Sequence, residues 1–342
     1  MREMIKPLIS YPGAKNRFYE HMKPYFPLDM EVYVEPFFGG GSVGLNIAAD
    51  GDFQNIQKMV VGDLAPEIWA LWQGVKVNPS AVEEIATKWF KEKCPHLEEM
   101  QGNGFDAELY REYTEGKHKN WREEDLDEDS VAGIKYLIDL GDTVFKEATE
   151  FWDWTQRVVD EVQLSLEERA ARTLLVNRIS FSGMGDSGSL SKDRFTAFKL
   201  DSLDRVYETS KLLNRMEILN VSFEETMKHA YDKPDKSFVF LDPPYWKQEA
   251  SGLYGRHGDT HRGFPHEKFA ECTKALPCKW FVTYDDSVKV RQMFDGCYIK
   301  PFTIPGGYVM AMKNSEDALA GEEVFITNYE LDKDNDSLMD LL

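Results

Sequence analysis

The sequence predicts an α/β fold with a doubly wound, mostly parallel sheet and an inserted, mainly helical segment. Three observations lead to this prediction. Short apolar runs alternate with helical patterns, the alternation is interrupted once, between about residues 66 and 200, and the last two apolar runs follow each other without a helix. Alternating strands and helices are typical of parallel sheets, and two strands in direct succession indicate an antiparallel edge.

Seven short runs rich in β-branched and aromatic residues are the expected strands. They are "EVYVEPF" (31–37), "KMVVGD" (58–63), "EILNVS" (217–222), "FVFLD" (238–242), "KWFVTY" (279–284), "YIKPFTI" (298–304) and "EVFITNY" (323–329). Helical patterns between most of these runs cover residues 42–49, 203–216, 264–276 and 285–296.

The interruption divides the chain. Residues 1–65 and 201–330 are predicted to form one discontinuous α/β domain, and residues 66–200 an inserted helical domain. Within the insertion, "GMGDSGSLSKDRF" (183–195) is rich in glycine, serine and charge, which predicts a hairpin or a turn. Residues 331–342 are expected to be a frayed acidic tail.

Composition and charge narrow the class of protein. A chain of 342 residues with 42% hydrophobic content buries a substantial core. Its start lacks the continuous apolar core of a secretion signal, and no run is long enough to span a bilayer, so we expect a soluble, cytoplasmic protein. The four cysteines lack the paired spacing of a zinc site, and we predict no metal.

The net charge of −20 argues at first against a polyanionic partner. The charge is unevenly distributed, however. Residues 66–165 hold 23 acidic and 11 basic residues, and residues 316–342 hold 9 acidic and 1 basic, so the rest of the chain is neutral. Within that remainder, residues 172–199 carry five basic side chains against two acidic ones, which predicts a locally basic surface.

The stretch "FVFLDPPYWK" ends an apolar strand in an acid and two prolines. Pro243 and Pro244 lack the N–H that a central strand needs, so the chain leaves the sheet in a stiff, extended turn after Asp242. Two interpretations stay open. The turn is a strand stop with Tyr245 and Trp246 packed beneath it, or it presents a carboxylate, a carbonyl and a ring to a ligand at the sheet edge.

Other candidate residues lie at the same edge. The first strand leads through Glu35 into Gly39, Gly40 and Gly41, where the backbone can approach a ligand closely, or simply turn. Asp63, after the second strand, suits the ribose of an adenosine-containing cofactor, or caps the next helix. Ser222 and Phe223 follow the third strand and could flank a purine ring. Alternatively, Ser222 is a helix cap and Phe223 is part of the hydrophobic core. With Asp242 these residues predict a cofactor site.

Three motifs in this order, "LISYPGAKNR", "VEPFFGGGSVGLN" and "FLDPPY", resemble those of the Dam-type (D12 class) DNA adenine-N6 methyltransferases. The resemblance extends from residue 8 to about residue 329. It implies a Rossmann-like class I methyltransferase fold, S-adenosylmethionine as cofactor without a metal, and double-stranded DNA as substrate. It also implies that the target adenine is flipped out of the duplex, because its N6 is otherwise paired.

The resemblance further assigns residues to roles. It implies that Asp242, Pro243, Pro244 and Tyr245 form the catalytic tetrad. The cofactor-binding residues predicted from position and resemblance are Tyr11, Lys15, Glu35, Phe37, Gly39, Gly41, Asp63, Ser222, Phe223 and Asp242. Residues 177–198 resemble the family's DNA-reading segment, and we expect Arg178, Lys192, Arg194 and Lys199 to contact DNA. Arg256 lies in the loop 252–269, which we expect to touch phosphates; its histidines leave a metal site as the alternative.

The chemistry of the target suits the tetrad. The lone pair of an adenine amino group is delocalised into the ring, and two acceptors, the Asp242 carboxylate and the Pro243 carbonyl, would free it. Methylation of cytosine N4 or RNA adenine, and a catalytically silent DNA-binding protein, stay open as alternatives. The helical insertion is larger and more acidic than DNA reading requires, so self-association or a protein partner is also considered.

Overall fold

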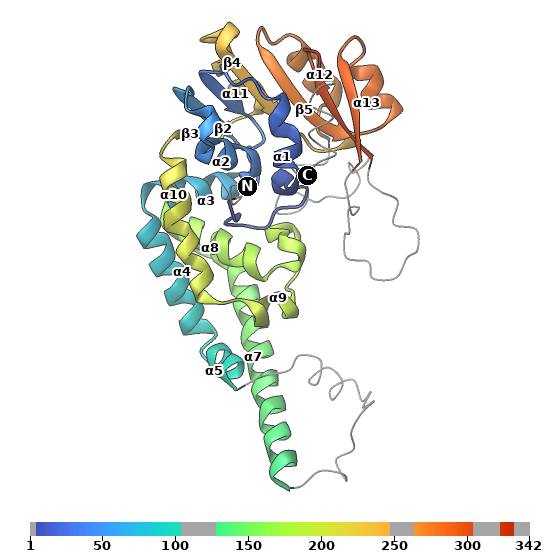
Figure 1. The fold of residues 1–342 in the computed structure, drawn as a ribbon. Coiled ribbons are helices and arrows are strands. Elements are labelled where there is room, and N and C mark those ends of the chain that lie inside the picture. The colour runs from blue at the N-terminus through green and yellow to red at the C-terminus, as the bar shows by residue number, and fades with distance from the viewer. Residues whose placement is uncertain (1–4, 104–127, 247–262, 304–321, 332–342) are drawn as a thin grey trace.

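The computed structural model describes residues 5–103, 128–246, 263–303 and 322–331 (Figure 1). Its centre is a seven-stranded sheet in the order β3-β2-β1-β4-β5-β7-β6. The strands are β1 (Val32–Glu35), β2 (Lys58–Gly62), β3 (Met216–Leu219), β4 (Ser237–Leu241), β5 (Lys279–Asp285), β6 (Tyr298–Thr303) and β7 (Glu322–Thr327). β7 runs antiparallel to both β5 and β6, and the pairs among β1 to β5 are parallel. The predicted doubly wound sheet with an antiparallel edge is confirmed.

The sheet is buried on both faces because alternate strand residues point to opposite sides. In β4, Phe238 and Phe240 join one core, and Val239 and Leu241 join the other. The first face is covered by α1 (Tyr19–Met22), α2 (Ser42–Ala49), α3 (Pro66–Val77) and α10 (Arg205–Leu213). The second is covered by α11 (Phe223–Met227), α12 (His266–Lys274) and α13 (Val288–Met293).

Between β2 and β3 the described residues form helices and no strand. Besides α3 these are α4 (Pro79–Lys93), α5 (Leu97–Gly102), α7 (Glu128–Glu161), α8 (Leu166–Ile179) and α9 (Lys192–Ala197). α8 begins with a capping box in which Ser165 and Glu168 cap each other's backbone. α4, α5 and α7 extend away from the sheet (Figure 1). The division at residues 65 and 200 stays a prediction, because α3 packs on α8 and also bonds to β3 through the Trp69 indole.

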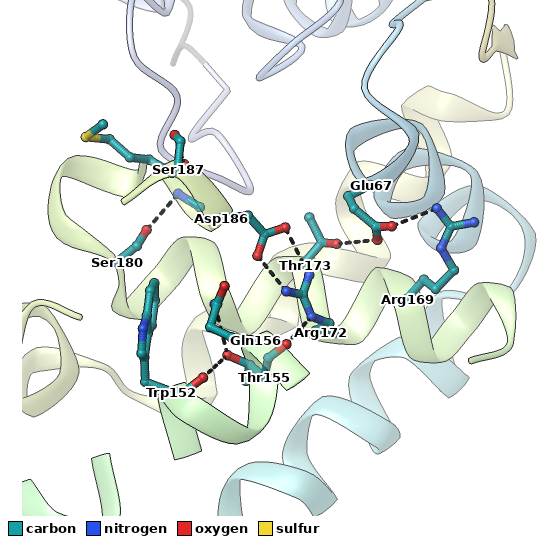
Figure 2. Close-up of polar contacts among 12 residues, drawn as sticks. Glu67, Trp152, Thr155, Gln156, Arg169, Arg172, Thr173, Ser180, Asp186 and Ser187 are labelled. Atoms are coloured by element: carbon teal, nitrogen blue, oxygen red, sulfur yellow. Dashed lines mark hydrogen bonds and ion pairs between the residues drawn. The ribbon is translucent and has the colours of Figure 1, made fainter. Parts of the chain in front are cut away.

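The expected hairpin at residues 183–195 differs from the structure. A single antiparallel bridge, Ser180 to Leu190, closes a loop of two short 3₁₀ turns, and the chain is helical from Lys192. Two backbone hydrogen bonds, from Phe181 N–H to the Ser189 carbonyl and from Ser191 N–H to the Ile179 carbonyl, flank the bridge, and side chains hold the rest of the loop. The buried Arg172 donates to both carboxylate oxygens of Asp186, at 3.1 and 2.5 Å, and to the Thr155 carbonyl at 2.6 Å (Figure 2). The glycine and serine content of this segment does not reveal the side-chain contacts that hold the loop.

Two further findings bear on the sequence predictions. No helix within the described ranges is long and apolar enough to cross a membrane. The four cysteines are free thiols. Residues 332–342 of the expected tail lie outside the described residues.

Candidate active site

The acidic residues predicted at strand ends meet at one edge of the sheet. Glu35 ends β1, Asp63 follows β2, and Asp242 follows β4. The parallel pairing of β1 with both β2 and β4 brings the three ends together. Burial raises the pKa of Glu35 well above its usual value, with the hydrogen bond from Tyr33 opposing and the negative charges of Asp242 and Asp63 adding to the shift.

Asp242 is held by a buried lysine. Lys15 Nζ lies 2.9 and 3.1 Å from the two carboxylate oxygens, and Thr283 donates its hydroxyl to the carboxylate at 2.6 Å. The ammonium group also donates to the Gly13 carbonyl at 2.8 Å and lies 4.9 Å from the centre of the Tyr245 ring. Lys15, which the resemblance assigned to the cofactor, therefore contacts the predicted catalytic carboxylate and tyrosine.

The tetrad's ring rests on an aromatic wall. Pro243 is buried and Pro244 partly so, and the turn carries Tyr245 onto Tyr284, with ring centroids 5.8 Å apart and planes at 25°. The Tyr284 hydroxyl and Nδ1 of the buried His266 are hydrogen-bonded. The ring of Trp246 meets His266 edge-on at 5.0 Å, so Trp246 is part of this wall.

Sequence reasoning missed Thr283 and Tyr284, and it placed His266 in the loop expected to touch phosphates, whereas the structure buries this side chain at the start of α12. The first two lie near the end of β5, directly beside β4, and a predicted strand order would have pointed to them. Burial raises the pKa of Tyr245 well above its usual value, with the positive charge of Lys15 opposing and Glu323 adding to the shift, so the phenol is neutral at physiological pH. Glu323 itself is buried in β7, and burial raises its pKa too.

The glycine loop packs tightly on Tyr11. A Cβ added at Gly39 would lie 2.7 Å from Tyr11 Cε1, and one at Gly40 would lie 2.7 Å from Tyr11 Cβ. Gly39 and Gly41 also have positive φ angles, of 45° and 69°. Close packing of Tyr11 is thus one reason for the glycines. Gly41 is the N-cap of α2.

Asp63 connects the loops that follow β1 and β2. Its carboxylate accepts the Gly39 N–H at 2.8 Å through one oxygen and the Ala65 N–H at 2.9 Å through the other. Desolvation raises the pKa of Asp63 to about 6, and the two backbone hydrogen bonds oppose the shift. Each carboxylate oxygen can accept a further hydrogen bond, so the group can still receive one from a ligand hydroxyl.

An apolar wall lies beside these acids. Phe37 stacks on Phe223 with ring centroids 5.8 Å apart and planes at 26°, and Phe264 and Phe269 pack edge-on against Phe37. Ser222 caps α11 by accepting the Glu225 N–H at 3.4 Å. Acceptors on one side and phenyl rings on the other suit a ligand with a sugar and a planar base.

The predicted DNA contacts divide into two kinds. Lys192 and Lys199 are exposed, and the Lys192 ammonium lies 4.7 Å from the Phe145 ring centre. Arg194 is partly buried and donates to the carbonyls of Asn177 and Arg178, both at 3.1 Å, which is a structural role. Arg178 is also partly buried, and Arg256 lies outside the described residues. Among the residues described, no cluster of three or more metal-ligating side chains occurs.

The strand order, the reversed β7 and the Asp-Pro-Pro-Tyr turn after β4 together define a class I methyltransferase. Residues 11–305 match the family "D12 class N6 adenine-specific DNA methyltransferase", and the chain belongs to this family. The family resemblance of the three motifs is confirmed, and the protein is an adenine-specific DNA methyltransferase.

A curated relative agrees with the family match. The protein is similar to the Type II methyltransferase M1.LlaDCHI of Lactococcus lactis subsp. cremoris, with 22% identity over 338 residues. The alignment covers 95% of this chain and 96% of the relative, so the two proteins correspond over nearly their whole lengths.

Proposed function

We propose that this enzyme methylates adenine N6 at a specific sequence in duplex DNA, with S-adenosylmethionine as methyl donor. The Type II name of its relative supports a place in a restriction-modification system. The observation that carries the proposal is the Asp242 carboxylate, fixed by Lys15 and Thr283 beside Tyr245 at the edge where Glu35 and Asp63 lie.

The residues present fit S-adenosylmethionine. Asp63 would bind the ribose hydroxyls, because its carboxylate keeps acceptor capacity beyond its two backbone bonds. Phe223 and Ser222 would border the adenine, and Phe37 would lie against the methionine part. Tyr11, Glu35, Gly39 and Gly41 would complete the site. The cofactor supplies, when bound, a methyl group activated by a sulfonium sulfur.

The tetrad residues act on the target amino group. The Asp242 carboxylate and the Pro243 carbonyl would each accept one N6 hydrogen, which favours the pyramidal geometry that frees the nitrogen lone pair. Tyr245 would stack on the flipped base and set its angle. Lys15 acts in this proposal by orienting the Asp242 carboxylate, since its ammonium group bonds to both oxygens. Positioning of the reacting atoms accounts for most of the catalysis.

The DNA is bound by the basic part of the insertion. Lys192 and Lys199 are exposed and suit phosphate oxygens, while Arg194 supports the end of α8. The flipped adenine would lie against the Tyr245 ring, which itself rests on Tyr284. A role for Arg256 in phosphate contacts stays part of the proposal.

The test is to incubate the purified protein with labelled S-adenosylmethionine and unmethylated DNA, and to analyse the nucleosides. We expect label in N6-methyladenine only, and none with Asp242→Ala. Label only in cytosine, or only when RNA is supplied, would contradict the proposal, and no label at all would favour a silent DNA-binding protein. Sequencing the product at base resolution gives the recognised site.

Self-association or partner binding through the acidic insertion is a separate proposal. The insertion's long helix α7 extends away from the sheet (Figure 1). Sedimentation of the protein at increasing concentration tests it, and a single monomeric species throughout the micromolar range would contradict self-association.

A further inference from the structure

A histidine lies buried in the aromatic wall on which the tetrad's ring rests. His266 is the first residue of α12 and is 2% exposed. The rings of Phe264 and Trp246 meet the imidazole edge-on, with centroids 4.9 and 5.0 Å away. A polar ring in such surroundings is stable only where it is hydrogen-bonded, and Nδ1 of His266 is hydrogen-bonded to the hydroxyl of the fully buried Tyr284.

Tyr284 connects this histidine to the tetrad. Its ring stacks on the ring of Tyr245, with centroids 5.8 Å apart and planes at 25°. Tyr284 and its neighbour Thr283 lie on β5, and Thr283 donates its hydroxyl to Asp242 at 2.6 Å. Two consecutive residues of one strand therefore support the first and the last residue of the Asp-Pro-Pro-Tyr turn.

The hydrogen bond gives the stacked pair a direction that stacking alone lacks. Offset aromatic pairs are favourable over a range of offsets and tilts, and the χ2 torsion of a tyrosine is broad. A hydrogen bond, in contrast, weakens steeply as its angle departs from linear, so it restricts where the Tyr284 hydroxyl lies. The imidazole can impose this restriction because it is itself held. The backbone N–H of His266 donates to the Phe264 carbonyl at 2.9 Å, and Trp246 and Phe264 pack against the ring.

We propose that His266 is a positioning residue for methyl transfer, which holds the Tyr245 ring at its working angle through the Tyr284 hydroxyl. The inference rests on the proposed function, in which Tyr245 stacks on the flipped adenine. His266 does not touch the reacting atoms in this role, and it moves no proton. It acts through one hydrogen bond and one ring stack, because an error in the angle of the base would misalign its N6 with the methyl group.

The alternative role for the pair of His266 and Tyr284 is purely structural. The pair would then only fill the core between β5 and α12, where Tyr284 also packs against Phe269. A structural pair stabilises the fold and leaves the rate of the folded enzyme unchanged, whereas a positioning pair changes that rate as well. Stability and the rate of methyl transfer are therefore measured on the same variants.

The test compares Tyr284→Phe, which removes only the hydroxyl, with His266→Leu and His266→Asn. Tyr284→Phe and His266→Leu should each lower the single-turnover rate of methyl transfer by about tenfold, with the affinities for DNA and for S-adenosylmethionine within about twofold of the wild type. His266→Asn should restore most of this rate, because the asparagine amide can donate or accept a hydrogen bond near the position of Nδ1. The matched control is Thr273→Val, a nearly isosteric change at a buried residue further along α12, which should leave the rate unchanged.

The double variant His266→Leu/Tyr284→Phe distinguishes the two roles. Its rate should be no lower than that of either single variant, because both changes break the same contact. Its melting temperature should exceed that of His266→Leu, because no tyrosine hydroxyl then lies buried against the leucine. Single variants that transfer methyl at the wild-type rate but melt at a lower temperature would overturn the inference. A double variant about a hundredfold slower than the wild type would overturn it too. Absence of transfer by the wild type itself would instead overturn the proposed function, and this inference with it.

Discussion

Replacing Asp242 by alanine removes the proposed acceptor for the target amino group and, at the same time, the counter-ion of Lys15. The two side chains are 22% and 3% exposed, and Lys15 Nζ lies 2.9 Å from the nearer carboxylate oxygen. Loss of one partner from a buried ion pair costs about 3–5 kcal/mol. Lys15 keeps its bond to the Gly13 carbonyl and its place over the Tyr245 ring, so we expect the lower end, about 3 kcal/mol.

The double variant Lys15→Met/Asp242→Ala separates the two effects. It removes the isolated charge, so it should regain about 2 kcal/mol of unfolding free energy relative to Asp242→Ala, measured by urea denaturation. Methyl transfer should be reduced by at least about 10³-fold in both variants, because the acceptor is absent in both. DNA binding should remain close to that of the wild type.

Two results would refute this reasoning. If the double variant is no more stable than Asp242→Ala, the ion pair does not stabilise the fold as argued. If Asp242→Ala turns over near the wild-type rate in a single-turnover assay, the assignment of the tetrad is wrong.

Three further predictions concern the surrounding structure. Protonation of Asp63 below its pKa of about 6 weakens it as an acceptor, so the affinity for the cofactor should fall about tenfold per pH unit below pH 6. The Asp63→Asn variant should bind the cofactor weakly and without this pH dependence, as measured by calorimetry. Arg172→Met leaves Asp186 without its buried counter-ion and should lower the free energy of unfolding by about 3–5 kcal/mol in urea denaturation. The double variant Arg172→Met/Asp186→Leu should recover much of this loss. If the single variant is as stable as the wild type, the ion pair does not stabilise the fold. Gly39→Ala places Cβ 2.7 Å from the Tyr11 ring at a residue with a positive φ angle. The substitution should therefore lower the free energy of unfolding by about 1–3 kcal/mol, measured by thermal denaturation. In a Tyr11→Ala background the loss should be smaller.

The sequence was sufficient to predict the strands of the sheet and the edge of the sheet at which the candidate site lies. Each strand is an apolar run ended by polar or turn-forming residues, so its position does not depend on distant contacts. In parallel strands the carboxyl ends share one edge, so the amino-acid pattern alone is enough to place Glu35, Asp63 and Asp242 there. The structure does bring them to that edge, while their roles stay a proposal.

The side-chain partners could not be predicted in the same way. Lys15 and Asp242 are 227 residues apart, and a sequence motif does not show where a long side chain points. The charge pattern of residues 172–199 predicted that Arg172 belongs to a basic surface. In the structure, Arg172 is fully buried against Asp186 and the Thr155 carbonyl. Nearly all of α8 from Ala170 to Ile179 is buried, so no apolar stripe distinguished an inward arginine from an outward one.

The acidic net charge is compatible with a DNA substrate once paired and unpaired cations are counted separately. Arg169 and Arg172 are neutralised by carboxylates, whereas Lys192 and Lys199 are exposed and Arg178 lacks a carboxylate partner among the described residues. Acidic α7, with 34 residues, is about 50 Å long and extends away from the sheet (Figure 1). Salt screens exposed charges beyond about 8 Å at physiological ionic strength, so acids at the far end of α7 scarcely affect the electrostatic potential near α8. Under the proposed function, local unpaired charge would therefore determine where DNA binds, and the net charge of the chain would not.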